Sequence, residues 1–233
     1  DIDCDIENLL PELSISYLIN LVLTNAIYCN AEWQVPFPKE ATHDAPFTLL
    51  DGTQINVPTM SQTLTVPYVE RDGVVAIELP YKGEAFSMLI LMPERDAFGA
   101  FEQSLTTENL MAILDNLEIT SLRLSLPKFD FAAEYDMIPV LRTLGMERAF
   151  TDGEADFSGI DGTRELLVTG IFHQAFVAVD EEGTEAGAAT GVVVGPTSAP
   201  GQDVRIDQPF LFVICDRSTR SVLFMGRVLD PSS

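Results

Sequence analysis

Few side chains in this sequence are of the types that catalyse reactions or bind metal ions. There are two histidines, His43 and His173, and three cysteines, Cys4, Cys29 and Cys215, with no short spacing between any two cysteines. An odd number of widely separated cysteines predicts neither a disulfide framework nor a zinc site.

The common catalytic motifs are also missing from the sequence. It has no Gly-x-Ser-x-Gly, no His-Glu-x-x-His and neither of the glycine-rich phosphate-binding patterns. Asp152, Glu154 and Asp156 lie close together, but their spacing does not match an EF-hand. We interpret this segment as a solvated loop, and we expect no metal ion and no cofactor.

The net charge restricts the partners that the protein can bind. The chain has 13 Lys and Arg against 36 Asp and Glu, which gives −23 with histidine neutral. Nucleic acids and anionic membrane surfaces both require clustered cations, so we exclude both classes of partner. The sequence also has no apolar run of 18 residues, which a membrane-spanning helix needs. We interpret the acidic residues as a solubilising surface of the kind suited to a salty or acidic habitat.

The segment 183–195, GTEAGAATGVVVG, is unusual in having no proline, lysine, arginine or aromatic residue and a single charge, Glu185. Its even-numbered residues, from Thr184 to Val194, are small and uncharged, so they would face a core if the segment formed a strand. Alanine and glycine are poor strand formers, and small residues are also typical of flexible spacers. The residues after Val204 suffice for two or three strands but not for a separate domain, so the segment connects a domain to itself. The sequence is therefore compatible with either a strand or a functional loop at residues 183–195.

The remaining sequence predicts an α+β protein dominated by sheet. The apolar run 21–28 predicts a central strand covered on both faces. The turns at 51–52 and 81–84 predict two hairpins, and helices are expected to begin near Thr106 and Asp136, the second ending at Gly145. Further strands are expected at residues 122–126, 166–179, 209–215 and 221–229.

Several of these segments resemble the serpin family. Residues 172–177 (FHQAFV), followed by 181–186 (EEGTEA), resemble the strand and hinge of a serpin. Residues 207–212 (DQPFLF), followed by 224–228 (FMGRV), are similar to the serpin C-terminal hairpin. Residues 25–28 (NAIY), followed by Trp33, resemble the third strand of the main serpin sheet and its buried tryptophan. The resemblance covers essentially the whole chain in the family's order.

The resemblance implies a serpin-like α+β fold with large mixed sheets, packed helices and an exposed reactive-centre loop. Residues 1–233 would form one partial serpin domain, with the hinge and loop at 183–203. The helices and strands that precede the equivalent of Leu21 in serpins are expected to be absent. The two strands that separate to admit the loop would lie at 21–28 and 166–180.

The function that the resemblance implies is suicide inhibition of a serine protease, without enzymatic activity of its own. The protease would cut the loop and form an acyl-enzyme, and the loop would then enter the main sheet as a new strand. Counting forward from the hinge glycine by the spacing that is usual in serpins places the cut at Thr197-Ser198. Counting back from Pro209 in the same way places it at Ser198-Ala199. We prefer the first, because insertion constrains the hinge length. A small neutral residue there disfavours trypsin-like enzymes and favours elastase-like or subtilisin-like ones.

The resemblance also assigns roles to individual residues. Asn25 and His173 would hydrogen-bond across the opening sheet, and Trp33 would lie where insertion begins; ordinary core positions are the alternative for all three. The hinge residues are Glu182, Gly183, Thr184, Glu185, Ala186, Ala188 and Thr190.

The implied partner is a target serine protease in a covalent complex, with loop–sheet polymerisation as a second form of association. The implied location is extracellular or periplasmic, with the signal segment outside this sequence. One alternative is a non-inhibitory serpin that acts as a carrier or binding protein. Such members tend to have bulky or charged residues where this chain has Thr184, Ala186 and Ala188. Another alternative is an inactive fragment with a structural role, which the shortness of the chain favours.

Overall fold

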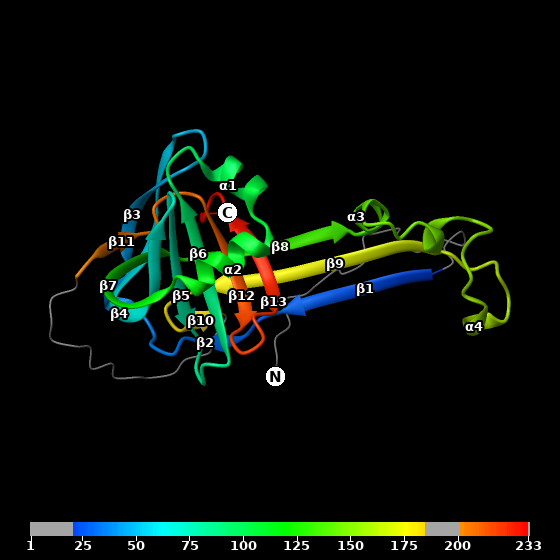
Figure 1. Cartoon of the computed structure of the whole chain (residues 1–233), viewed down its shortest axis with the longest axis horizontal. Coiled ribbons are helices and arrows are strands. Elements are labelled where there is room, and N and C mark those ends of the chain that lie inside the picture. The colour runs from blue at the N-terminus through cyan, green and yellow to red at the C-terminus, as the bar shows by residue number, and fades with distance from the viewer. Residues whose placement is uncertain (1–20, 185–200, 233) are drawn as a thin grey trace. The chain divides into compact units, whose positions relative to one another are not determined.

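The computed structural model describes residues 21–184 and 201–232. It divides the chain into two compact units, each assembled from separate stretches of sequence (Figure 1). The first contains Asp1–Cys29 and Phe131–Val177, and the second contains Asn30–Asp130 and Ala178–Ser233.

Most of the regular structure is β-sheet, as the sequence predicts. The strands are β1 (Leu21–Tyr28), β2 (Ala31–Glu32), β3 (His43–Thr48), β4 (Gln54–Arg71), β5 (Val74–Pro80), β6 (Phe86–Pro93), β7 (Glu118–Pro127), β8 (Phe129–Asp136), β9 (Val168–Val179), β10 (Gly183–Thr184), β11 (Asp203–Arg205), β12 (Phe210–Asp216) and β13 (Val222–Val228). The helices are α1 (Phe98–Ser104), α2 (Thr107–Asp115), α3 (Ile138–Thr143) and α4 (Ser158–Asp161), with 3₁₀ turns η1 (Lys39–Ala41) and η2 (Arg148–Phe150).

The first unit is built on the parallel pairing of β1 with β9. The register runs from Leu21 opposite Val168 to Tyr28 opposite Phe176, and the rings of Tyr28 and Phe176 stack with their centroids 6.4 Å apart. Strand β8 also pairs with β9. These two long strands are therefore direct neighbours along the whole of β1.

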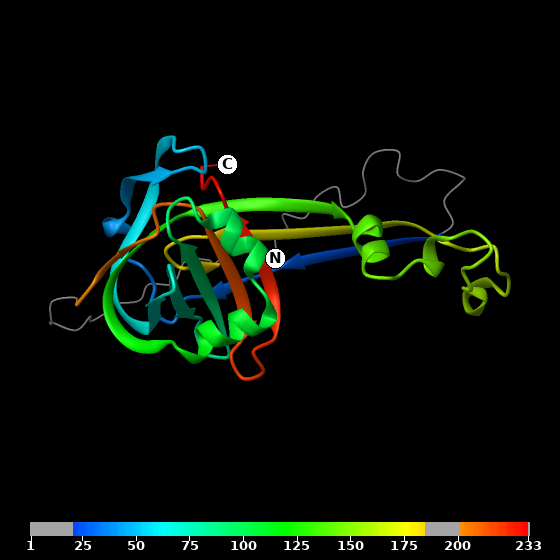
Figure 2. The ribbon, with the colours of Figure 1, turned by 45° about the horizontal axis from the view of Figure 1, so that its top comes forward.

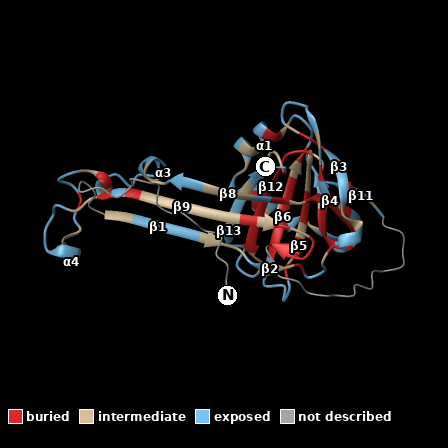
Figure 3. Cartoon of the chain, turned by 180° about the vertical axis from the view of Figure 1, so that it is seen from behind, coloured by how far each residue is buried: buried red, intermediate tan, exposed pale blue. Residues whose placement is uncertain are grey.

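One prediction about this unit is wrong. The apolar run at Leu21–Tyr28 forms a strand, but its four central residues are exposed, and Leu23 is 44% exposed (Figure 3). Pairing with β9 satisfies one edge of β1, but the described residues do not bury its two faces. A continuous apolar run indicates a preference for burial, and it does not specify which segment supplies the cover.

The second unit contains an eight-stranded sheet in the order β11-β7-β4-β5-β6-β12-β13, with β3 paired to β4. All neighbours are antiparallel except β11 and β7, which are parallel. The two predicted hairpins are confirmed: Gly52 has φ +84° in the turn between β3 and β4, and Gly83 has φ +85° between β5 and β6. Glycine is favoured at both positions because a residue with a β-carbon is strained at positive φ.

One hydrophobic cluster of this unit joins the sheet to the two helices α1 and α2, which cover part of the sheet (Figure 2). Phe98 of α1 and Leu110 of α2 pack against buried residues of β6 and β12, including Leu89 and Leu211. Helix α2 begins as predicted, with the hydroxyl of Thr106 accepting a hydrogen bond from the backbone N–H of Asn109 at 3.2 Å. Strand β7 alternates as predicted, with its leucines buried and Arg123 exposed. None of the described helices is long and apolar enough to cross a membrane.

Candidate hinge and loop-insertion site

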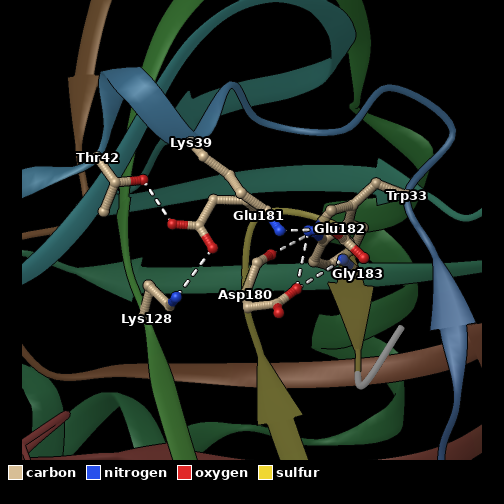
Figure 4. A network of polar contacts seen from close by, with 8 residues as sticks. All are labelled: Trp33, Lys39, Thr42, Lys128, Asp180, Glu181, Glu182 and Gly183. Carbon is tan, nitrogen blue, oxygen red and sulfur yellow. Dashed lines mark hydrogen bonds and ion pairs between the residues drawn. The ribbon is translucent and has the colours of Figure 1, made fainter. Parts of the chain in front are cut away.

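The end of β9 and strand β10 form a tight hairpin, and the residues from Ala178 onward belong to the second unit (Figure 4). The carboxylate of Asp180 accepts hydrogen bonds from the backbone N–H groups of Glu182 (2.8 Å) and Gly183 (3.2 Å), which is the usual way in which aspartate stabilises a turn. A β-carbon at position 183 would collide with the carbonyl oxygen of Ala31, so only glycine fits there.

Strand β10 lies between the end of β9 and β2. Thr184 pairs antiparallel with Val179 on one side and with Ala31 on the other. Its side chain is fully buried, and its hydroxyl oxygen lies 2.6 Å from the hydroxyl oxygen of Tyr81. Thr184 therefore already occupies a sheet position, with its side chain turned inward.

Trp33 connects the hairpin turn to Tyr81. Its backbone N–H donates to the carbonyl of Glu182 at 2.8 Å, and its indole N–H donates to the carbonyl of Asp180 at 2.9 Å. Its ring stacks on that of Tyr81 with the centroids 4.8 Å apart and the planes 4° from parallel. Because Tyr81 also contacts Thr184, one aromatic pair links the turn to the first inward-facing residue.

The carboxylate of Glu181 is nearly buried, with its side chain 7% exposed. It accepts hydrogen bonds from the ammonium of Lys128 at 2.8 Å and from the hydroxyl of Thr42 at 2.7 Å (Figure 4). Burial alone would raise the pKa of Glu181, but these two hydrogen bonds outweigh it and hold that pKa below its ordinary value. The group is therefore ionised at neutral pH.

The other two lysines of the chain also form ion pairs here. Lys39 lies 2.6 Å from the carboxylate of Glu182, which raises the pKa of Lys39. Lys82 lies 2.6 Å from the carboxylate of Glu32 in β2. Since the sequence has no further lysine beyond Lys128, every lysine pairs with an acidic residue in or beside the hinge hairpin.

Asn25 and His173 lie in the first unit, where they are opposite one another in the β1–β9 register. The Nδ1 atom of His173 is 2.9 Å from the side-chain oxygen of Asn25. The structure thus pairs these two residues, and it places Trp33 separately, with the hinge hairpin of the second unit.

Several sequence-predicted residues lie outside the described residues. They are Glu185, Ala186, Ala188, Thr190, Thr197 and Ser198. Conversely, sequence reasoning missed Tyr81, Lys39, Thr42 and Lys128. The available signal was the run of three acidic residues before Gly183, which must find cations in a chain with few of them. No three described His, Cys, Asp or Glu side chains are grouped so that they could hold a metal ion.

Comparison with known proteins identifies the family. The sequence profile of the family described as serpin (serine protease inhibitor) matches residues 2–231. The chain belongs to the serpin family. The family is one of protease inhibitors rather than enzymes, and the predicted membership and α+β fold are confirmed.

Individual relatives agree with this assignment. The chain is 41% identical over 222 residues to an uncharacterized serpin-like protein of Thermococcus kodakarensis, covering 93% of this chain and 51% of that protein. It is 38% identical over 239 residues to the leukocyte elastase inhibitor of Equus caballus, covering 97% and 63% respectively. The crystal structure of a highly specific serpin from the insect Tenebrio molitor matches with a TM-score of 0.85 and 33% identity, covering 97% and 60%. This serpin chain spans about half to three fifths of the length of the relatives that it matches.

Proposed function

We propose that the protein inhibits a serine protease by inserting its own cleaved loop between β1 and β9. The observation that carries the proposal is the position of Thr184, which is already paired in a sheet and runs antiparallel to β9. A strand that continues β10 along β9 would separate β9 from β1, its present parallel neighbour in the first unit. Serpin loop insertion is a known example of strand addition.

The energetics support insertion after cleavage. A new strand between β1 and β9 would replace one ladder of backbone hydrogen bonds by two, so the net gain is one ladder. About ten hydrogen bonds at about 1 kcal/mol each favour insertion by roughly 10 kcal/mol. Cleavage is needed because the uncut loop is tied at both ends, to β10 and to β11.

The proposed target is an elastase-like or subtilisin-like protease that cuts between Thr197 and Ser198. A trypsin-like pocket selects lysine or arginine, and the threonine side chain is small and carries no charge. The similarity to a protein named leukocyte elastase inhibitor supports the same class of target. The position between β1 and β9 would also accept the loop of a second molecule, which would produce loop–sheet polymers.

The test is a titration of the intact protein with an elastase and a subtilisin, with trypsin for comparison. We expect an SDS-resistant complex whose mass equals protease plus protein minus the released C-terminal peptide, and we expect that peptide to begin at Ser198. Cleavage without a complex would indicate a non-inhibitory serpin or an inactive fragment. A cut after Arg205 would contradict the proposed specificity.

A further inference from the structure

The three lysines of the chain are concentrated at the hinge, whereas its ten arginines are distributed over other elements. Two of the lysine ion pairs, Lys39–Glu182 and Lys82–Glu32, are short, at 2.6 Å each. The lysine side chains are 64% and 71% exposed, whereas the side chains of Glu182 and Glu32 are 9% and 33% exposed. We call these two contacts the exposed lysine pairs.

The exposed lysine pairs hold the two segments that contact β10, namely the hairpin turn before it and the neighbouring strand β2. Glu182 lies in the hairpin turn that precedes β10, and Lys39 reaches it from η1. Glu32 lies in β2, opposite Gly183 in the β2–β10 register. Lys82 makes two contacts with Glu32. Its ammonium pairs with the Glu32 carboxylate, and its backbone N–H donates a hydrogen bond to the Glu32 carbonyl at 2.8 Å.

We propose that Lys39 and Lys82 are positioning residues that keep Thr184 between β9 and β2, and that salt concentration consequently tunes the efficiency of inhibition. The inference rests on the proposed function. Lysine presents a single flexible point charge, and both lysine side chains are largely exposed, so dissolved ions can reach and screen these pairs. The screening length falls from about 14 Å at 0.05 M salt to about 3 Å at 1 M.

The exposed lysine pairs are expected to stabilise the turn because it contains several negative charges. Asp180, Glu181 and Glu182 are consecutive carboxylates in a chain of net charge −23. Lys128 compensates one of them, and without Lys39 the remaining like charges would repel one another across the turn. A turn that opens would withdraw Thr184 from its place beside Val179 and Ala31.

The kinetic consequence follows from the competition between insertion and hydrolysis of the acyl-enzyme. The number of inhibitor molecules consumed per trapped protease, minus one, equals the hydrolysis rate divided by the insertion rate. With Thr184 in place, the first step of insertion is already complete. A molecule whose turn is open still has to complete that step, so its acyl-enzyme is more often hydrolysed. Losing either exposed lysine pair should raise the fraction of molecules with an open turn, and hence the excess consumption of inhibitor, about two- to fivefold. Losing both should raise it about tenfold if the pairs act independently.

The experiment compares Lys39→Gln, Lys82→Gln and the double variant with the parent protein in titrations of an elastase. Arg220→Gln is the control, because it removes another short ion pair, Arg220–Asp115 at 2.7 Å, away from the hinge. At about 0.05 M NaCl, we expect the excess consumption of inhibitor to rise two- to fivefold in each single variant, with an unchanged cleavage rate. At about 1 M NaCl, the difference between the parent and each variant should be smaller. Lys39→Arg should restore the parent value.

An unchanged excess consumption in both lysine variants, or an equal rise in Arg220→Gln, would overturn the proposal. A second measurement needs no protease: hydrogen–deuterium exchange of the peptide that covers residues 179–184. We expect faster exchange in the lysine variants at low salt and the parent rate in Arg220→Gln. If the parent traps no protease, the proposed function fails, and the exchange rates still decide whether the two lysines keep Thr184 in place. Equal exchange rates in the parent and the double variant would refute it.

Discussion

Replacing Thr184 by arginine is the most informative single perturbation of the hinge. The threonine side chain is fully buried, and its hydroxyl is 2.6 Å from that of Tyr81. Val179 and Ala31 flank it closely on the two neighbouring strands. Arginine is larger and permanently charged, so the substitution forces either a buried guanidinium or a displaced hinge.

The smaller of these two costs determines the outcome. Burying an unpaired cation costs several kcal/mol. Displacing the hinge loses the Thr184–Tyr81 hydrogen bond, the burial of the threonine side chain and the backbone pairing of β10, at about 1 kcal/mol each. Displacement, at about 3 kcal/mol, is therefore the expected response when burial of the cation costs more than that. The ratio of molecules with the hinge in place to molecules with it displaced then falls about tenfold for each 1.4 kcal/mol by which the burial cost exceeds the displacement cost.

The assay separates cleavage of the loop from trapping of the protease. Cleavage should proceed at the parent rate, because residue 184 lies far along the chain from Thr197. The acyl-enzyme should then hydrolyse before the loop inserts, so gels should show cleaved protein and no covalent complex. Thr184→Ser keeps the hydroxyl and adds no bulk, so it serves as the matched control and should still trap protease.

Two results would refute this reasoning. If Thr184→Arg traps protease at the parent stoichiometry, the hinge does not have to occupy its buried position for insertion. If Thr184→Ser loses trapping to the same extent, burial of a charge is not the cause of the defect.

Three further predictions concern the residues around the turn. Tyr81→Phe should lower the free energy of unfolding by about 1 kcal/mol in urea titrations, because it removes the hydrogen bond to Thr184; an unchanged value would contradict that role. Lys128→Gln should cost about 2 kcal/mol by the same measurement, because it leaves the nearly buried carboxylate of Glu181 without its cation, and a cost equal to that of Arg220→Gln would argue against this. The lowered pKa of Glu181 means that its stabilisation is complete above the ordinary value of 4.5 and is lost as the pH falls through the lower folded-state pKa. The difference in stability between the parent and Lys128→Gln should therefore shrink below pH 4.5, and a constant difference at acid pH would exclude Glu181 as its source.

The elements that the sequence predicts well are those with a local cause. Asp51-Gly52 specifies a hairpin turn by itself, and Thr106 specifies the start of α2 through a hydrogen bond three residues away. The alternation around Arg123 likewise follows from strand geometry alone. The same parity argument predicts that Thr184 faces inward, and its side chain is buried.

The parts that the sequence does not predict depend on distant segments. Tyr81 contacts Thr184 across 103 positions, and Lys128 reaches Glu181 across 53. No periodicity or spacing rule connects such residues, because the order of strands in the sheet brings them together. The exposed faces of β1 have a similar explanation, since an apolar run does not identify its cover. The pairing of Asn25 with His173 was expected only through the family resemblance.

The thermal stability of the protein before and after a single cut in the loop tests the central claim most directly. The intact protein and the protein nicked by an elastase are melted under identical conditions, after separation from any protease complex. If the freed loop becomes a strand between β1 and β9, the midpoint temperature of unfolding should be much higher in the nicked protein, because the sheet gains a complete ladder of backbone hydrogen bonds. An unchanged or lower midpoint after cleavage at Thr197-Ser198 would show that the loop does not insert.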